Sequence, residues 1–180
     1  SDFYIYTVHM IAGVATRDIA APPGEPLGGY WGRSRDGCQP CRDSLSARVF
    51  FFEEAGLAAA VVALDLVGVS STFAARLQRA ARDAAVAAGR AAPSVMVAAT
   101  HTHNSPQTHD TMVGFGHASQ GYMQFVVDAV AEASRQAANS ARPAAIRHVR
   151  TAPLGLSVNR RQRAPEETDA EPPSKRPRGG

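Results

Sequence analysis

The sequence predicts an α/β domain in which helices pack on a mixed central sheet. Three observations point to this class: two apolar runs joined by a glycine-containing turn, a strand–helix–strand segment after them, and an apolar composition dominated by alanine. Aromatic residues are only 7% of the chain, so the core should depend on close packing of small side chains rather than on large rings. One layered domain of the α/β or α+β type, followed by a tail, is therefore expected.

The first part of the chain predicts three strands. One is expected over residues 12–19, before a Pro-Pro-Gly break. A hairpin should follow, because the runs 47–53 and 57–66 are separated by three residues that end in Gly56, a residue suited to positive φ. The second run is apolar at nearly every position, which is typical of a strand buried on both faces.

The second part predicts two helices and two further strands. A helix should begin in the Ser/Thr cluster 70–72 and end before Gly89, with apolar residues recurring at helical spacing between them. The apolar run 95–99 is too short for a helix and predicts a central strand parallel to its predecessor. A second helix at about 121–140 and a return strand at 144–150 complete the expected domain.

Composition and charge argue against several classes of protein. The net charge of +3 comes from arginines scattered among acids, so no nucleic-acid partner is predicted. No run approaches the roughly 20 apolar residues that a membrane-spanning helix needs. Residues 1–10 lack a basic segment followed by an apolar one, so no signal peptide is predicted and the cytoplasm is the default compartment. Contact with a membrane surface stays open.

The two ends of the chain differ in composition from its centre. Residues 1–10 form an extension without an assigned structure, and residues 11–161 form the expected domain. Residues 162–180 are rich in Pro, Glu, Lys and Arg and have almost nothing to bury, so a disordered tail is expected. Cys38 and Cys41 form a lone C-x-x-C, which plain loop residues, a disulfide or a labile metal contact would each explain.

The segment 100–106, Thr-His-Thr-His-Asn-Ser-Pro, is the main candidate for chemistry. It follows the predicted strand 95–99 directly, at the carboxyl end where open α/β sheets place their ligand sites. In extended backbone, His101 and His103 would face the same pocket. Two imidazoles can bind one Zn²⁺, which lowers the pKa of a bound water from ~15.7 to roughly 7, or they can divide ligand and acid/base roles. The alternative is a pair of loop histidines satisfied by backbone carbonyls.

This segment also resembles a known family. Residues 98–106, Ala-Ala-Thr-His-Thr-His-Asn-Ser-Pro, are similar to the A-T-H-T-H-S-G/A-P signature of the neutral/alkaline non-lysosomal ceramidases. Further segments resemble the family in the same order: the opening strand at 12–19, L-x-G-Y-x-x-R-S at 27–34, D-x-L-x-A-R at 43–48, V-A-L-D-L-V-G at 62–68 and an Asn-Arg turn within 156–161. The resemblance implies a partial fold, the N-terminal portion of a larger catalytic domain.

The resemblance implies a zinc-dependent amidohydrolase that splits the N-acyl bond of ceramide or a related lipid amide. His101 matches the zinc ligand of the signature, and His103 matches a residue beside the metal that contacts the substrate or the attacking water. Asn159 and Arg160, from the Asn-Arg turn, would bind the substrate, with Arg160 anchoring a hydroxyl or the developing oxyanion. Asp65 would orient a histidine or a water, or would serve as a helix cap or surface residue.

The same resemblance leaves the metal site incomplete. The family adds a second His, a Glu and a Tyr from beyond its Asn-Arg turn, so this chain is expected to be inactive without the missing C-terminal half of the domain. Tyr30 and Arg33 either line the mouth of the site or anchor the Gly-rich loop. Two alternatives stay open: a related hydrolase of another amide or ester, and a non-catalytic remnant whose open sheet edge pairs with another chain. Family members are often secreted, so the compartment stays unknown.

Overall fold

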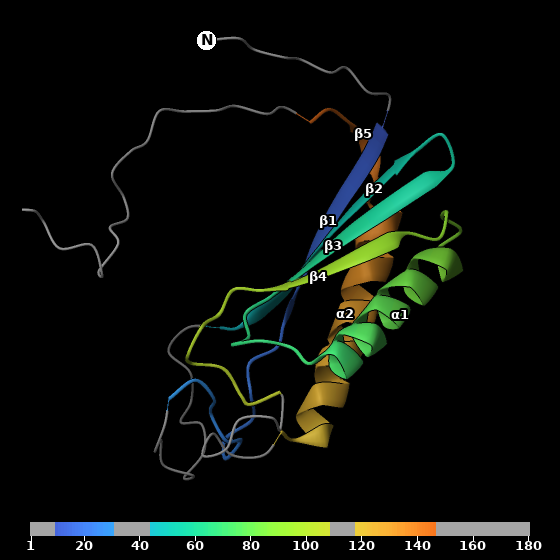
Figure 1. Ribbon diagram of the computed structural model, residues 1–180. Coiled ribbons are helices and arrows are strands. Elements are labelled where there is room, and N and C mark those ends of the chain that lie inside the picture. Colours follow the sequence, from blue (N-terminus) through green and yellow to red (C-terminus); the bar gives the residue numbers. More distant parts are fainter. Residues whose placement is uncertain (1–9, 31–43, 109–117, 147–180) are drawn as a thin grey trace, which may run out of the picture. The chain divides into compact units, whose positions relative to one another are not determined.

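The computed structural model describes residues 10–30, 44–108 and 118–146. Its elements, in chain order, are β1 (Met10–Asp18), β2 (Ser46–Glu54), β3 (Leu57–Leu64), α1 (Ser71–Ala87), β4 (Ser94–Ala99), α2 (Gln120–Asn139) and β5 (Arg142–Ala144). The strands form one mixed sheet of order β4-β3-β2-β1-β5, and both helices lie on the same side of it (Figure 1). The predicted α/β class is confirmed. The predicted tail at 162–180 and the Cys38–Cys41 loop lie outside the described residues, and the domain limits 11–161 stay a prediction.

The predicted hairpin is confirmed, with β2 and β3 antiparallel and Gly56 at φ 79°. Side chains on these strands alternate between two environments. Val49 and Phe51 of β2, and Val62 of β3, are 0–1% exposed and point toward the helices. The intervening Phe50 is 37% exposed. Along β3, the buried residues Ala60, Val62 and Leu64 alternate with partly exposed ones, and Leu57 is 79% exposed. The expectation that this second run is buried on both faces is therefore wrong, because the described helices cover only one face of the sheet.

The predicted strand–helix–strand unit is also confirmed, since β4 pairs parallel with β3 after α1 crosses over. The expectation that this strand is central is wrong for the described residues, because β4 pairs only with β3 and forms an edge of the sheet. Ser70 caps α1, and its hydroxyl accepts a hydrogen bond from the Phe73 amide at 3.2 Å. Gly89 follows the helix at φ 76°, as a C-terminal glycine should. The buried side of α1 repeats every four residues: Phe73, Leu77, Ala81 and Ala85.

Helix α2 packs against β1 and β2, and a glycine permits the close approach. A Cβ added at Gly13 would lie 1.9 Å from the Ala137 carbonyl oxygen, so no larger residue fits there without moving the helix.

The return strand predicted at 144–150 is corrected: β5 covers Arg142–Ala144 and pairs with β1, and residues beyond 146 are not described. Pro143 fits this edge strand because an edge position does not need every amide for the ladder.

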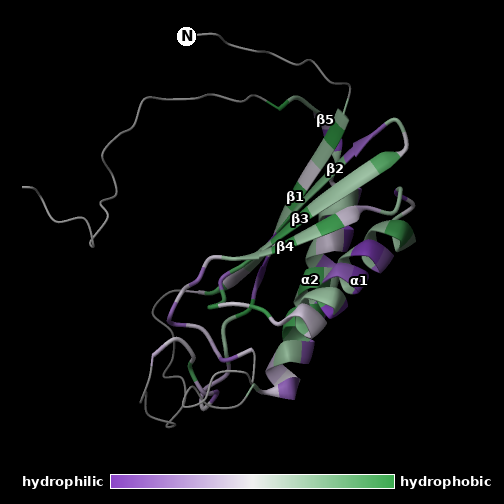
Figure 2. Cartoon of the chain, in the orientation of Figure 1, coloured by the Kyte–Doolittle hydropathy of each residue, from purple (hydrophilic) through white to green (hydrophobic). Residues whose placement is uncertain are grey.

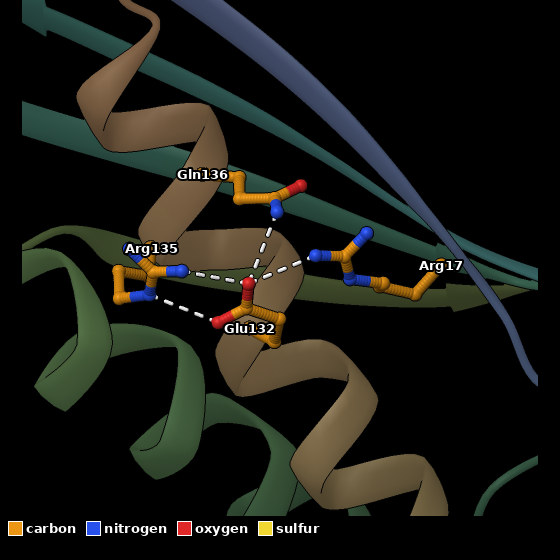
Figure 3. A network of polar contacts seen from close by, with 4 residues as sticks. All are labelled: Arg17, Glu132, Arg135 and Gln136. Carbon is orange, nitrogen blue, oxygen red and sulfur yellow. Dashed lines mark hydrogen bonds and ion pairs between the residues drawn. The ribbon is translucent and has the colours of Figure 1, made fainter.

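A polar network ties β1 to α2 on the surface (Figure 3). Glu132 of α2 accepts hydrogen bonds from Arg135 at 2.7 and 2.9 Å and from Arg17 of β1 at 2.8 Å, and Gln136 adds a fourth at 3.0 Å. The bonds from Arg135 and then Arg17 lower the pKa of Glu132 from 4.5 to about 2. The outer sides of the helices are otherwise largely hydrophilic, whereas the strands are mostly apolar (Figure 2).

Candidate metal-binding site at the carboxyl end of β4

The chain leaves β4 beside the segment that leaves β3. The Thr100 amide donates to the Leu64 carbonyl at 2.9 Å, and the His101 amide donates to the Leu66 carbonyl at 3.0 Å. His101 itself has φ 64°, in the left-handed region that non-glycine residues rarely adopt. The backbone therefore turns sharply at the first histidine instead of continuing extended. Such strained positions concentrate at functional sites, which favours a functional reading of this turn.

The two predicted histidines lie together. The Nε2 atoms of His101 and His103 are 3.3 Å apart, and their ring centroids are 4.8 Å apart with the planes at 84°. The expectation that the rings share one side is met, although the turn at His101, rather than an extended run, brings them together. On its other edge, His101 places Nδ1 2.6 Å from the carbonyl oxygen of Val67.

The Val67 carbonyl determines which nitrogen of His101 is available. A carbonyl oxygen can only accept, so Nδ1 of His101 carries the proton in this contact. In the neutral ring, Nε2 then presents its lone pair toward His103. A backbone carbonyl is one of the partners, with carboxylates and water, that accept the second N–H of metal-binding histidines and so fix the tautomer and the ring orientation. The contact with Val67 thus leaves Nε2 of His101 as the nitrogen that faces the second histidine.

The distance between the Nε2 atoms of His101 and His103 is compatible with a shared metal ion. Two nitrogens bound at about 2.0–2.1 Å to one tetrahedral zinc lie about 3.3 Å apart, which is the separation found here. The same geometry serves a ligand and a neighbouring acid/base group. Within the described ranges, no group of three or more His, Cys, Asp or Glu residues could hold a metal. The residues fit part of a zinc site and leave at least one further ligand to come from elsewhere.

The Gly-rich loop packs directly on the second histidine. The rings of Tyr30 and His103 meet edge to face, with centroids 5.0 Å apart. Gly29 has φ 97°, and a Cβ added to it would lie 2.8 Å from Cγ of His103. A glycine is therefore required at position 29 both for its backbone conformation and for the space that His103 occupies. Tyr30 is 55% exposed, so it lies at the rim of the site.

Backbone-directed hydrogen bonds hold the loop after the histidines. The fully buried Ser105 accepts a bond from the Val67 amide on its hydroxyl at 3.0 Å, and its carbonyl accepts one from the Gly28 amide at 2.9 Å. Thr108, also fully buried, donates from its hydroxyl to the Gly68 carbonyl at 2.6 Å. The segment that carries the Val67 carbonyl and the loop that carries Gly29 are both fastened to the histidine loop.

Asp65 lies behind the site but contacts neither histidine. It accepts hydrogen bonds from the amide and hydroxyl of Ser46 at 3.0 and 2.5 Å, and from the Thr100 hydroxyl at 3.2 Å. Arg48 lies 3.4 Å away. Burial opposes ionisation of this carboxyl, but the bonds from Ser46 and the charge of Arg48 outweigh it and lower the pKa of Asp65. Asp65 therefore fixes the residue before His101 rather than a histidine ring.

The structure thus brings together His101, His103 and Tyr30. Asp65 is connected to them only through Thr100, the residue before His101. Asn159 and Arg160 lie outside the described residues, so their placement stays a prediction. Sequence reasoning missed the Val67 carbonyl and the hydroxyl of Ser105. A backbone carbonyl has no sequence signature, whereas a small polar residue directly after the histidines was a usable signal.

Fold and site together define an α/β domain with a histidine pair at a strand end. The same fold occurs in solved ceramidases. The chain superposes on part of the neutral ceramidase from Pseudomonas aeruginosa with a TM-score of 0.62 and 21% identity. A ceramidase complexed with C2 gives 0.61 and 22%. Each comparison covers 76% of this chain and 22% of the other, so the chain spans about a fifth of these proteins' length.

These comparisons confirm the expected resemblance at the level of the fold. The sequence matches no known family profile and no curated protein. Among the described helices, none combines the length and apolar character needed to cross a membrane.

Proposed function

We propose that this chain is the histidine-bearing part of a ceramidase-like, zinc-dependent amidohydrolase acting on the N-acyl bond of ceramide or a related lipid amide. One observation carries the proposal: two Nε2 atoms lie 3.3 Å apart at the carboxyl end of β4, in a fold shared with solved ceramidases. Ligand sites of open α/β sheets lie at this end of the strands. At 21% identity, the superposition supports the fold alone. The hydrolase assignment therefore rests on the geometry of the two histidines.

The proposed roles follow from the contacts of each residue. Zinc, when bound, would polarise the scissile carbonyl and activate water at neutral pH. His101 would hold the ion through Nε2, because Val67 fixes its other nitrogen. His103, with its ring nitrogen beside that point, would exchange a proton with the attacking water or the leaving amine. Asn159 and Arg160 would bind the substrate, as the motif implies.

The proposal includes a contribution from polypeptide beyond the described residues. Catalytic zinc sites have three protein ligands, and the single imidazole of His101 binds the ion more weakly than such a set. The chain spans 22% of the length of the ceramidases that it resembles. We therefore propose that the missing C-terminal half of the domain supplies the remaining ligands, and that the 180-residue chain alone binds zinc without turning over substrate.

Zinc binding to the chain itself tests the proposal. Isothermal titration with Zn²⁺ should show a site whose affinity falls at least about tenfold in His101→Ala. Asn104→Ala, in the same loop, is the control and should bind like the unaltered chain. In ¹⁵N spectra, zinc should shift Nε2 of His101 far more than Nδ1. A folded chain whose zinc affinity is the same with and without His101 would refute the zinc assignment.

The substrate class needs a separate assay. The chain joined to, or mixed with, the remaining part of the domain should hydrolyse a ceramide, and simple esters should be poorer substrates. A preparation that cleaves only esters would replace the lipid-amide assignment with the related-hydrolase alternative. Zinc binding would then stand, so the two parts of the proposal fail separately.

A further inference from the structure

The sheet has a second face that neither of the described helices covers. On this face β2 presents Phe50 and Phe52, the neighbouring β1 adds Val14, and β4, on the far side of β3, adds Met96. Val14, Phe50 and Met96 are 57%, 37% and 58% exposed. Both helices lie on the opposite side (Figure 1), and no other described element packs here. Strands of α/β sheets with such apolar runs are normally covered on both sides.

The exposed apolar side chains form continuous rows across the strands. Strand register aligns Val14 with Phe50, Phe50 with Val61, and Val61 with Met96. The next row contains Phe52, and beside it the face is hollowed by a shallow depression of about 530 Å³. The depression lies mainly between β1, β2 and β5. A surface of this kind accepts side chains from an opposing sheet.

The charges on β2 indicate which molecule packs on this exposed face of the sheet. Along the exposed side, β2 reads Arg48, Phe50, Phe52, Glu54, with a cation at one end and an anion at the other. This order is self-complementary: a second β2 running in the opposite direction sets each Arg48 against Glu54 of the other copy. Arg48 retains 47% side-chain exposure beside Asp65, so it can make a further contact. A parallel arrangement would bring like charges to the same end.

We propose that this chain forms a homodimer in which the bare sheet faces stack with the two β2 strands antiparallel. The phenylalanines of one copy would pack on those of the other, and the Arg48–Glu54 pairs would flank them. Two aligned sheets stacked about 10 Å apart make the ordinary core of a β-sandwich. The dimer would thus complete the second apolar layer that each copy lacks. This inference is independent of the proposed function.

The area available matches a dimer of moderate strength. Strands β1 to β4, about 4.8 Å apart and about eight residues long, give a face of roughly 500 Å² in projection. Two such faces would bury on the order of 1,000 Å², near the lower limit for a specific interface. The dimer should therefore dissociate in the micromolar range rather than the nanomolar range.

Sedimentation equilibrium of the full chain tests the dimer. The unaltered chain should show a reversible monomer–dimer equilibrium. Met96→Lys, on the β4 side of the patch, should raise the dimer Kd at least about tenfold, because a charge enters the apolar interface. Val86→Lys is the matched control: Val86 is 50% exposed but lies on α1, on the other side of the sheet, so its Kd should stay unchanged.

A second pair of variants tests the charges without disturbing the apolar patch. Glu54→Lys should raise the Kd severalfold by placing two cations together, whereas Asp83→Lys, the same charge change on the exposed side of α1, should not. Circular dichroism shows whether Met96→Lys is folded. If it is not, the comparison of Glu54→Lys with Asp83→Lys tests the dimer by itself. A chain that stays monomeric at about 100 µM overturns the proposal. Equal dimerisation of Glu54→Lys and the unaltered chain overturns it too.

Discussion

The helix-covered side of the sheet and the histidine loop at its end are stabilised by different forces. Behind the helices, Phe51, Phe73 and Leu77 are 0–1% exposed and pack as an apolar core. In the loop, the positions of the histidine rings depend on single hydrogen bonds, such as those of the Ser105 hydroxyl and the Val67 carbonyl. The core holds the fold through many interchangeable contacts, whereas the loop holds two rings through a few specific ones.

The contrast teaches that stability and site geometry can be altered separately. A change in the core should lower the free energy of unfolding and leave the arrangement of the histidines intact in the molecules that stay folded. A change in the loop should disturb the arrangement of the histidines and lower the free energy of unfolding less. Three substitutions, taken from the largest expected effect on stability to the smallest, test this separation.

Phe51→Ala should have the largest effect. The side chain is 1% exposed between the sheet and the helices, and its removal should cost about 3–5 kcal/mol of unfolding free energy in urea titrations. Phe50→Ala, one residue away on the bare face and 37% exposed, is the matched control and should cost about 1 kcal/mol. Equal losses would mean that both faces are covered in the monomer. The measurement should use protein dilute enough to avoid association.

Gly29→Ala should affect the site more than the fold. Its φ of 97° disfavours any Cβ, which costs about 1–2 kcal/mol, and the added carbon would press on the ring of His103. We expect the zinc affinity to fall and the His103 resonances to shift, with a smaller loss of stability than in Phe51→Ala. Gly24→Ala, also at positive φ but with open space around its Cβ, should show only the conformational part of this stability loss and should keep the zinc affinity. Unchanged His103 resonances in Gly29→Ala would contradict the contact.

The smallest effect should come from pH and Glu132. Its pKa in the folded chain is about 2 against an ordinary 4.5, so its contribution to stability is present above about pH 4.5 and is lost as the pH falls toward 2. Urea midpoints measured between these limits should fall less steeply in Glu132→Gln. Arg17→Gln, which removes one donor of the network, should give an intermediate slope. Identical slopes in all three proteins would show that the network contributes nothing.

Much of the fold could be predicted because its signals are local. The Ser70 cap, Gly89 and the apolar spacing between them predict α1, and the turn at Gly56 predicts the hairpin. The position of β5 was misjudged because the pairing of Arg142–Ala144 depends on β1, which is distant in the sequence. The bare face was missed for a similar reason: an apolar run shows that a strand can be covered on both sides, not whether anything covers it.

By itself, the sequence determined the order of the elements and the presence of two histidines after an apolar strand, because periodicity and spacing are encoded in neighbouring residues. Only the tertiary structure decided which ring nitrogen of His101 is available, since that depends on the carbonyl of Val67, 34 residues away. It also decided that Gly29 lies against His103 and that Asp65 supports Thr100. Contacts between distant segments have no local signature, and they set the geometry on which any chemistry here depends.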